Sequence, residues 1–433
     1  MSPTRHPGPC TLAALALFAC GPTSGSDTTT DASTTTATSS SEPSVGTTTT
    51  GPPTTGEPTT SSDADTAAAT TVGTTTTGVD PGTTSDTTTT TTSDSSTTAD
   101  ADCTVVEFVE PALEAAVRLA YDLPPGPIAG DALTGPGGIV VTEFHHGPIA
   151  DLTGLECATG VVSLTLVGHE ALNDVSRIAG LTHLEWLELS ETGVTDLSPL
   201  AGLTALKNLY VANIPATDLS PLAGLSALEV LSLRASPSTD ISPLQHLAAL
   251  RRLDLGHTLP VDLSPLTGLV TLEELDLANS EVTDLAPLAG LPALVRLDLT
   301  HSAVTDLGPL AGLPKLERLF IANTDVADLS PLTGLPILYL YAPSCAISDL
   351  SPIASFPIPE VIDLRDNTIV EVDALAGVDW MVPENTCALL LLEGNPLSAA
   401  AKQQLFDMCD ATGVSFEAGF LQCITDACIP PPP

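Results

Sequence analysis

The sequence predicts an α/β fold in which short coils stack into a right-handed solenoid, with a parallel β-sheet on the concave face and short 3₁₀ or helical turns on the convex face. One observation is a strict repeat. The aspartate of the phrase Asp-Leu-Ser-Pro-Leu and its variants recurs every 22 residues from Asp174 to Asp328, and once more after 21 residues at Asp349. The other is the phrase Leu-x-x-Leu-x-Leu in each unit, whose last two leucines alternate as in a strand. Because one coil cannot bury its leucine face alone, the coils must stack to form a continuous core.

Each repeat places a strand, a turn and a corner in the same order. A small polar residue such as Thr192 follows the strand, and the corner then begins at Asp196. We expect Asp196 to accept backbone N–H groups and Ser198 to cap a short 3₁₀ or helical turn. Pro199 suits the first turn of that element and Gly202 suits its end.

The period, the leucine phrase and the Ser-Pro corner together resemble the bacterial leucine-rich-repeat family, most closely the internalin type with 22-residue coils. The resemblance covers roughly residues 106–416 and implies a leucine-rich-repeat solenoid of about ten coils. Two features depart from the family pattern. Thr or Ser often occupies the place where the family has Asn, and a hydroxyl offers the turn backbone fewer hydrogen-bonding groups. Ile214 is apolar at that place, which predicts a locally altered turn.

The ends of the stack need caps, because the terminal coils would otherwise expose the core. We assign residues 103–150 to an N-terminal cap, 151–395 to the repeats, and 396–433 to a C-terminal cap and tail. Residues 110–121 have helical apolar spacing, with Pro111 in the first turn. At the other end, Ser398 is placed to cap a helix over 399–411, and 414–416 can add a last strand.

The N-terminus resembles a bacterial lipoprotein signal over residues 1–19. The apolar run 11–19 is too short to span a bilayer and ends in Leu17-Phe18-Ala19-Cys20. The resemblance implies acylation of Cys20 and, because Gly21 is not the inner-membrane aspartate of that family, anchoring at the outer membrane or cell surface. Phe18 departs from the smaller residue usual there. Ordinary secretion and a retained anchor are the alternatives.

Residues 20–102 are a low-complexity Thr/Ser-rich stretch with too little apolar surface to offset the entropy of ordering it. We interpret this stretch as a disordered linker. O-glycosylation of the linker is left open.

Disulfides are expected in an exported chain. We pair Cys103 with Cys157, and we expect Cys345, which lies far from both ends of the solenoid, to be the free thiol. The remaining candidates allow three connectivities that sequence cannot distinguish; they are Cys387, Cys409, Cys423 and Cys428.

Composition and motifs exclude several classes of function. With 12 Lys and Arg against 53 Asp and Glu, the net charge is −41, which makes nucleic acid a poor partner. The sequence lacks the nucleophile-elbow, zinc-protease and phosphate-loop motifs, so no catalytic residue and no cofactor is predicted.

The residues between the leucines of each strand face the concave side, where neighbouring coils bring them into columns. The central column is Glu188, Tyr210, Ser232, Asp254, Asp276, Asp298, Phe320 and Tyr341. The flanking column is Trp186, Asn208, Val230, Arg252, Glu274, Arg296, Arg318 and Tyr339. Exposed aromatics and arginines dominate many binding interfaces. Arg234 lies in a third column on the other side of the central one, and the middle of the face combines aspartates with arginines. The candidate ligand residues are Trp186, Tyr210, Arg234, Arg252, Asp254, Asp276, Arg296, Asp298, Arg318, Phe320, Tyr339 and Tyr341.

Two alternatives to ligand binding exist for the aspartates of this face. The three stacked aspartates of the central column can be a solvated filler whose repulsion Arg252 and Arg296 offset, or a divalent-cation site. His257 and His301 lie two coils apart, too far for one zinc ion, and no metal site is predicted.

The prediction for function is a lipid-anchored, monomeric surface protein that binds a protein or polysaccharide on its concave face and touches the membrane only through its lipid. The alternative is a structural envelope protein with no discrete ligand. Both rest partly on family analogy.

Overall fold

The structure is a computed structural model that describes residues 103–259, 262–378, 380, 388–412, 415–418 and 421–423. Its strands form one sheet in which each strand pairs with the next in the sequence. All neighbours are parallel except β13 and β14. The strands are β1 Gly137–Thr142, β2 Val161–Val167, β3 Trp186–Glu188, β4 Asn208–Tyr210, β5 Val230–Ser232, β6 Arg252–Asp254, β7 Glu274–Asp276, β8 Arg296–Asp298, β9 Arg318–Phe320, β10 Tyr339–Tyr341, β11 Val361–Asp363, β12 Leu389–Leu391, β13 Ser415–Ala418 and β14 Leu421–Cys423.

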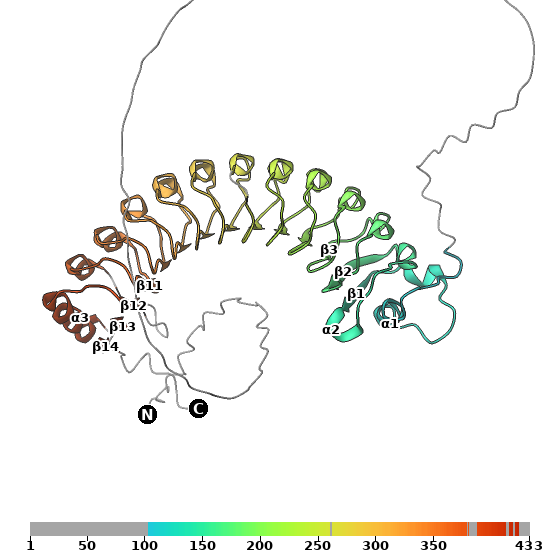
Figure 1. The fold of residues 1–433 in the computed structure, drawn as a ribbon, viewed down its shortest axis with the longest axis horizontal. Helices are drawn as coiled ribbons and strands as arrows, with labels where there is room; N and C mark the ends of the chain where they lie inside the picture. The colour runs from blue at the N-terminus through green and yellow to red at the C-terminus, as the bar shows by residue number, and fades with distance from the viewer. Residues whose placement is uncertain are drawn as a thin grey trace, which may run out of the picture. The chain divides into compact units, whose positions relative to one another are not determined.

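Short 3₁₀ helices alternate with the strands, as the sequence predicts. The coils form an arc with the strands on its inner side and the 3₁₀ turns on its outer side (Figure 1). The 3₁₀ helices are η1 Gly130–Leu133, η2 Leu155–Cys157, η3 Ser176–Ile178, η4 Ser198–Leu200, η5 Ser220–Gly224, η6 Ser242–His246, η7 Ser264–Leu266, η8 Ala286–Gly290, η9 Gly308–Gly312, η10 Ser330–Leu332, η11 Ser351–Ser355 and η12 Asp373–Gly377. The repeat leucines are almost completely buried in one continuous core. This architecture is a leucine-rich-repeat solenoid.

The aspartate at each corner, rather than the serine two residues on, caps the 3₁₀ turn. Asp196 Oδ1 accepts the backbone N–H of Ser198 at 2.8 Å, and the Ser198 hydroxyl donates to Asp196 Oδ2 at 2.8 Å. Ser198 therefore does not cap the turn as predicted. The backbone bond persists where serine is absent, since Ala286 donates to Asp284 at 2.8 Å and Gly308 donates to Asp306 at 2.7 Å. We call these one-per-coil residues the corner aspartates.

The prediction of an altered turn at Ile214 is wrong. Asn213, just before it, has φ 53°, close to the 55° and 60° of Ala235 and Glu191 in the neighbouring coils, and its N–H donates to the Arg234 carbonyl at 2.8 Å. Ile214 is simply buried, with an exposed fraction of 3%. The positive-φ residue and the inter-coil backbone bonds set the turn, so an apolar side chain is tolerated there.

At the place where the resemblance expects asparagine, several side chains bond the turn backbone. The Thr192 hydroxyl donates to the Leu189 carbonyl at 2.7 Å, whereas Asn367 donates to the carbonyls of Leu364 and Ala342 and accepts the N–H of Ile347. The hydroxyl thus makes fewer bonds than the amide, as expected. In the first coil the buried His169 takes this place, and burial lowers its pKa.

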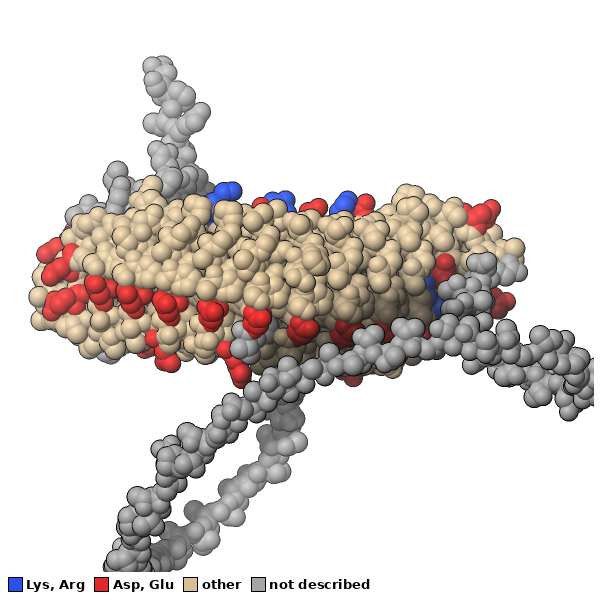
Figure 2. Space-filling view, turned by 90° about the horizontal axis from the view of Figure 1, so that it is seen from above, with Lys and Arg blue, Asp and Glu red and all other residues tan. Residues whose placement is uncertain are grey.

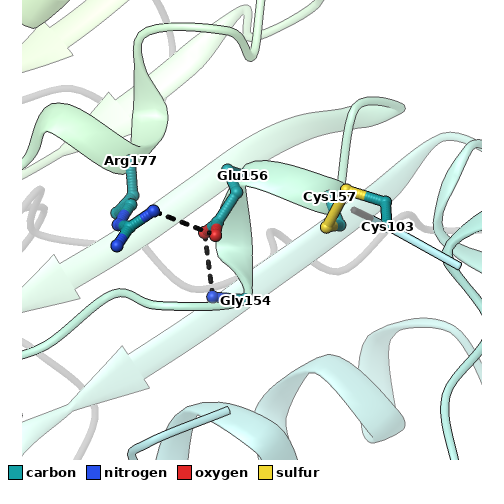
Figure 3. Close-up of a disulfide and its surroundings, with 5 residues drawn as sticks. All are labelled: Cys103, Gly154, Glu156, Cys157 and Arg177. Atoms are coloured by element: carbon teal, nitrogen blue, oxygen red, sulfur yellow. Dashed lines mark hydrogen bonds and ion pairs between the residues drawn. A yellow bond between two sulfur atoms is a disulfide. The ribbon is translucent and has the colours of Figure 1, made fainter. Parts of the chain in front are cut away.

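The N-terminal cap contains α1 Pro111–Ala120 and α2 Glu143–His146, and it carries the predicted disulfide. Cys103 and Cys157 are bonded across 54 residues of sequence, with a Cα–Cα distance of 5.6 Å. Beside the disulfide, Glu156 accepts the N–H of Gly154 and pairs with Arg177 at 3.2 Å (Figure 3). The disulfide therefore joins the cap to the first coil, and the Glu156 contacts hold the Cys157 turn beside the next coil.

The C-terminal cap is α3 Ala399–Thr412, followed by β13 and β14. The Ser398 hydroxyl accepts the Ala401 N–H at 3.0 Å and therefore acts as the predicted N-cap. The antiparallel strand β14 was not predicted. It follows β13 after two residues and continues the sheet at this end.

Several predictions lie outside the described residues. These are the signal at 1–19 with Cys20, the linker at 20–102, Cys387 and Cys428, and the side chains of Cys409 and Cys423. Within the described part, Cys345 is the free cysteine, as predicted.

Candidate ligand-binding face

The inner face of the arc carries the two predicted columns in the predicted register. In the register of the sheet, Tyr210 lies beside Glu188 and Ser232 of the neighbouring strands, and Asp276 lies beside Asp254 and Asp298. Tyr341 pairs with Phe320. The core leucine between the two columns points into the solenoid at each strand, so the column residues are left on the concave surface.

An aromatic pair occupies the N-terminal part of this face. The rings of Trp186 on β3 and Tyr210 on β4 are 4.9 Å apart, tilted by 37°, and both side chains are half-buried. Glu188 adjoins Tyr210 in the central column, and burial raises the pKa of its carboxyl. The pair offers one rigid apolar surface next to a carboxylate.

The three central aspartates are structural groups rather than a solvated filler. Each accepts a backbone N–H from the residue two positions on: Asp254 from Gly256 at 2.9 Å, Asp276 from Ala278 at 2.9 Å, and Asp298 from Thr300 at 3.1 Å. Burial raises the pKa of Asp276 and Asp298. The side chain of Asp298 is only 13% exposed.

The charges that offset these aspartates differ in part from the prediction. Arg234 lies between Asp254 and Asp276, at 3.6 and 3.5 Å. Arg252, expected to neutralise the central column, instead pairs with Glu274 at 3.1 Å in the flanking column. The reason is geometric, because Arg252 and Glu274 are direct neighbours across β6 and β7.

Gly256 makes the Arg234 position possible. A Cβ on Gly256 would lie 2.5 Å from Arg234 Nη1, closer than real atoms approach. The absent side chain leaves the space that the guanidinium fills. This use of glycine follows from packing and not from a positive φ.

Arginines and aromatic rings alternate in the C-terminal part of the face. Arg296 lies over the Phe320 ring at 4.7 Å and pairs with Asp298 at 3.0 Å. Arg318 lies over the Tyr339 ring at 5.1 Å, and the Tyr339 hydroxyl donates to Glu360.

The Phe320 and Tyr341 rings lie 6.1 Å apart. The cation–π contacts hold the two guanidinium groups against the sheet.

The columns extend further than predicted. Val361 and Leu389 continue the flanking column, and Asp363 and Leu391 continue the central one. Val361, Leu389 and Leu391 are only partly buried, so an apolar strip adjoins Tyr339 and Tyr341. The phrase Val361-Ile362-Asp363-Leu364 carries the strand signal that could have identified this continuation.

The residue three positions after each of several strands adopts a left-handed backbone conformation at the turn. Asn213, His257, Asn279, His301 and Asn323 all have φ between 53° and 59°. Asparagine tolerates this left-handed region best among non-glycine residues, and histidine is also enriched there. Among the described residues, no group of three or more His, Cys, Asp or Glu side chains could hold a metal ion.

Arginines on the concave side lie among the acidic residues of the columns. Five of the 12 Lys and Arg residues are on this side: Arg234, Arg252, Arg296, Arg318 and Arg365. The outer side carries the corner aspartates, and Figure 2, seen from above, shows a row of acidic side chains running along the length of the solenoid. The outer side therefore carries a row of acids, whereas the concave side mixes arginines with acids.

Comparison with known proteins supports the fold. A family model described as "Leucine Rich repeats (2 copies)" matches residues 182–224 and 270–312. No curated protein matches. The internalin InlF of Listeria monocytogenes has a similar structure, with a TM-score of 0.65 and 25% identity, covering 74% of this chain and 92% of that one.

Two further solved structures show weaker similarity. The internalin C2 of the same organism gives a TM-score of 0.43 at 27% identity, covering 54% of this chain and 94% of that one. A leucine-rich-repeat protein of Leptospira interrogans gives a TM-score of 0.46 at 15% identity, covering 66% of this chain and 97% of that one. The family model and the InlF structure show that this chain contains leucine-rich repeats and is internalin-like in fold.

Proposed function

We propose that this protein binds a polypeptide ligand on the concave face of its solenoid and acts as an exported adhesion or recognition protein. The observation that carries the proposal is the position of the aromatic residues. Half-buried rings lie on β3 and β4 and again on β9 and β10 of one continuous sheet face, with ion-paired arginines between the two groups. Aromatic and arginine side chains are the types that most often dominate binding free energy.

The fold class agrees with this proposal. Internalin-like leucine-rich-repeat domains typically bind other proteins and are typically not enzymes. Tyr210 and Phe320 lie five coils apart, which at ~4.8 Å per strand is about 24 Å. A ligand that touches both aromatic groups must therefore be extended or present a broad surface, which favours a protein over a small molecule.

The location also belongs to the proposal. An extracellular or surface location suits an internalin-like solenoid, and we infer anchoring through an acylated Cys20 with residues 20–102 as a tether. Within the described part of the chain, helices reach neither the length nor the apolarity that a membrane crossing needs. Metabolic labelling with a radioactive fatty acid tests the anchor, and a Cys20→Ala chain must lose the label.

A glycan is the second candidate ligand. Sugars stack on aromatic rings and donate hydroxyl hydrogen bonds to carboxylates, and Trp186, Tyr210 and Glu188 present both features side by side. A structural envelope role with no discrete ligand is the alternative from a different class.

Retention on the immobilised chain separates these possibilities. Secreted proteins and envelope glycans are passed over the unmutated chain and over the triple variant Trp186→Ala, Tyr210→Ala, Phe320→Ala, and the retained material is compared. The control variant is Leu119→Ala, Leu259→Ala, Val270→Ala, which removes exposed apolar side chains outside the two columns. We expect a retained protein to be lost from the first variant and kept by the control. If the unmutated chain retains nothing, or the control loses as much, the proposal is wrong.

A further inference from the structure

Arg318 differs from the other concave arginines. Arg234, Arg252, Arg296 and Arg365 each lie within 4 Å of a carboxylate. In the described part of the chain Arg318 has no such partner, although its side chain is exposed.

The sequence of β9 explains the difference. In β8, Arg296 pairs with Asp298, the residue two positions on. In β9 the corresponding place carries Phe320, so the acid that would neutralise Arg318 is missing. Glu360, two coils further along, accepts the Tyr339 hydroxyl instead.

The unpaired guanidinium is also held in place. One face of Arg318 lies over the Tyr339 ring at 5.1 Å, and Arg296 is its direct strand neighbour. Stacking leaves the in-plane N–H donors at the edge of the group free to point to solvent. A stacked guanidinium loses little entropy on binding a carboxylate, which it can engage with two parallel hydrogen bonds.

An apolar strip begins beside this cation. Tyr339, Val361 and Leu389 follow Arg318 in the flanking column, and all three are partly exposed. From β9 to β12 the distance is about 14 Å at ~4.8 Å per strand, which an extended polypeptide covers with about four residues. The strip therefore suits an apolar side chain a few residues from an acidic one.

We propose that Arg318 and the apolar strip of Tyr339, Val361 and Leu389 bind an extended peptide segment in which one carboxylate lies two to four residues from a large apolar side chain. This proposal rests on the function proposed above and names the ligand chemistry at one end of the face. A polyanion suits the site poorly, since the chain carries a net charge of −41 and the one concave arginine that is unpaired among the described residues can neutralise only one group. An isolated carboxylate on an otherwise apolar peptide meets Arg318 without that repulsion.

Arrayed synthetic octapeptides test this pairing on the full chain at ~0.15 M salt, where screening limits long-range attraction. Each peptide carries one Glu or its neutral isostere Gln, and one Leu at a spacing of one to six residues. We expect tightest binding for Glu at spacings of two to four, with Gln at least about tenfold weaker, as for a hydrogen bond to a charged group.

Variants assign the effect to Arg318. Arg318→Gln should abolish the preference for Glu over Gln, and Arg318→Lys should retain part of it because the charge remains and the stacked fork is lost. Lys315→Gln removes the same charge from an exposed residue outside both columns and should leave the preference unchanged. Equal thermal melting of all variants checks that the solenoid is intact.

Several results overturn the inference. They are equal binding of Glu and Gln peptides, an equal effect of Lys315→Gln, Arg318-dependent binding of alginate in place of peptide, and no retained peptide at all. Peptide binding that depends on Trp186 and Tyr210 but not on Arg318 refutes only this inference. Loss of all retention in the protein and glycan experiment above would refute the proposed function itself.

Discussion

Replacing Gly256 with alanine should displace Arg234 and change the electrostatics of the central column with little effect on stability. The new Cβ would lie 2.5 Å from Arg234 Nη1, so the guanidinium must move. It then leaves the positions 3.6 Å from Asp254 and 3.5 Å from Asp276. The other close atoms, the Oδ1 atoms of those aspartates, are 3.2 Å away and need to shift only slightly.

The free-energy change combines two opposing contributions. The Arg234, Asp254 and Asp276 side chains are 39%, 31% and 20% exposed, so solvent screens both pairs and their joint loss costs about 1 kcal/mol. Alanine recovers about 0.5–1 kcal/mol, because it loses less backbone entropy than glycine on folding. The free energy of unfolding should therefore change by less than about 1 kcal/mol.

The pKa of Asp276 should respond more clearly than stability does. Burial raises this pKa most, and the positive charge of Arg234 opposes the rise. When the guanidinium moves away, the pKa of Asp276 must rise further, which an NMR titration of its carboxyl carbon can follow beside urea denaturation. Gly268→Ala is the matched control, because no atom lies within 4 Å of its new Cβ. An unchanged Asp276 pKa, or a loss of stability beyond about 3 kcal/mol, would refute this account of Gly256.

Three further predictions concern the disulfide of the N-terminal cap, the dependence of stability on pH, and the effect of calcium on the melting temperature. The paired change Cys103→Ser, Cys157→Ser opens a 54-residue loop and should cost about 4 kcal/mol in denaturant unfolding; an unchanged midpoint would mean that the cap does not need the disulfide. As pH falls, Asp276 and Asp298, whose folded pKa is raised, should first add stability on protonation. The corner aspartates have a pKa lowered by a backbone N–H, so their contribution to stability should be lost as the pH falls below the unfolded value of about 3.8. The free energy of unfolding, measured by denaturation at a series of pH values, should therefore have a maximum in mild acid. Calcium should leave the melting temperature unchanged, because each central aspartate already accepts a backbone N–H and an arginine adjoins the column; a higher melting temperature would contradict this.

The fold and the concave columns could be predicted from sequence because they depend on periodicity. A fixed spacing of leucines sets the register, and the register determines which side chains become neighbours, as for Tyr210 with Glu188 and Ser232. The Cys103–Cys157 pairing followed similarly from position along the solenoid. None of these inferences needs a side-chain conformation.

The details that escaped prediction depend on individual side-chain contacts within a coil and between neighbouring coils. At the corner, Asp196 accepts the backbone N–H as predicted, but Ser198 does not cap the turn, because both residue types can cap and the Asp196 carboxylate reaches that N–H. Arg252 forms its ion pair with Glu274, its direct neighbour across β6 and β7, and not with Asp254 in its own strand. The role of Gly256 appears only when the guanidinium of a neighbouring coil is in place. Periodicity fixes neighbours, but side-chain conformation decides their partners.

The serines at the asparagine place offer a direct measure of what that place contributes to stability. The hydroxyls of Ser280 and Ser302 are buried and, in the described part of the chain, have no hydrogen-bond partner. Asn367 at the same place makes several bonds to the turn backbone, each worth about 1 kcal/mol. Ser302→Asn should therefore raise the free energy of unfolding by about 1–2 kcal/mol after some repacking, whereas Ser302→Ala should be nearly neutral because the hydroxyl bonds nothing. If denaturation shows the asparagine variant to be less stable than the alanine variant, the narrow stack has no room for an amide, and steric fit rather than hydrogen bonding would explain the hydroxyls in this repeat.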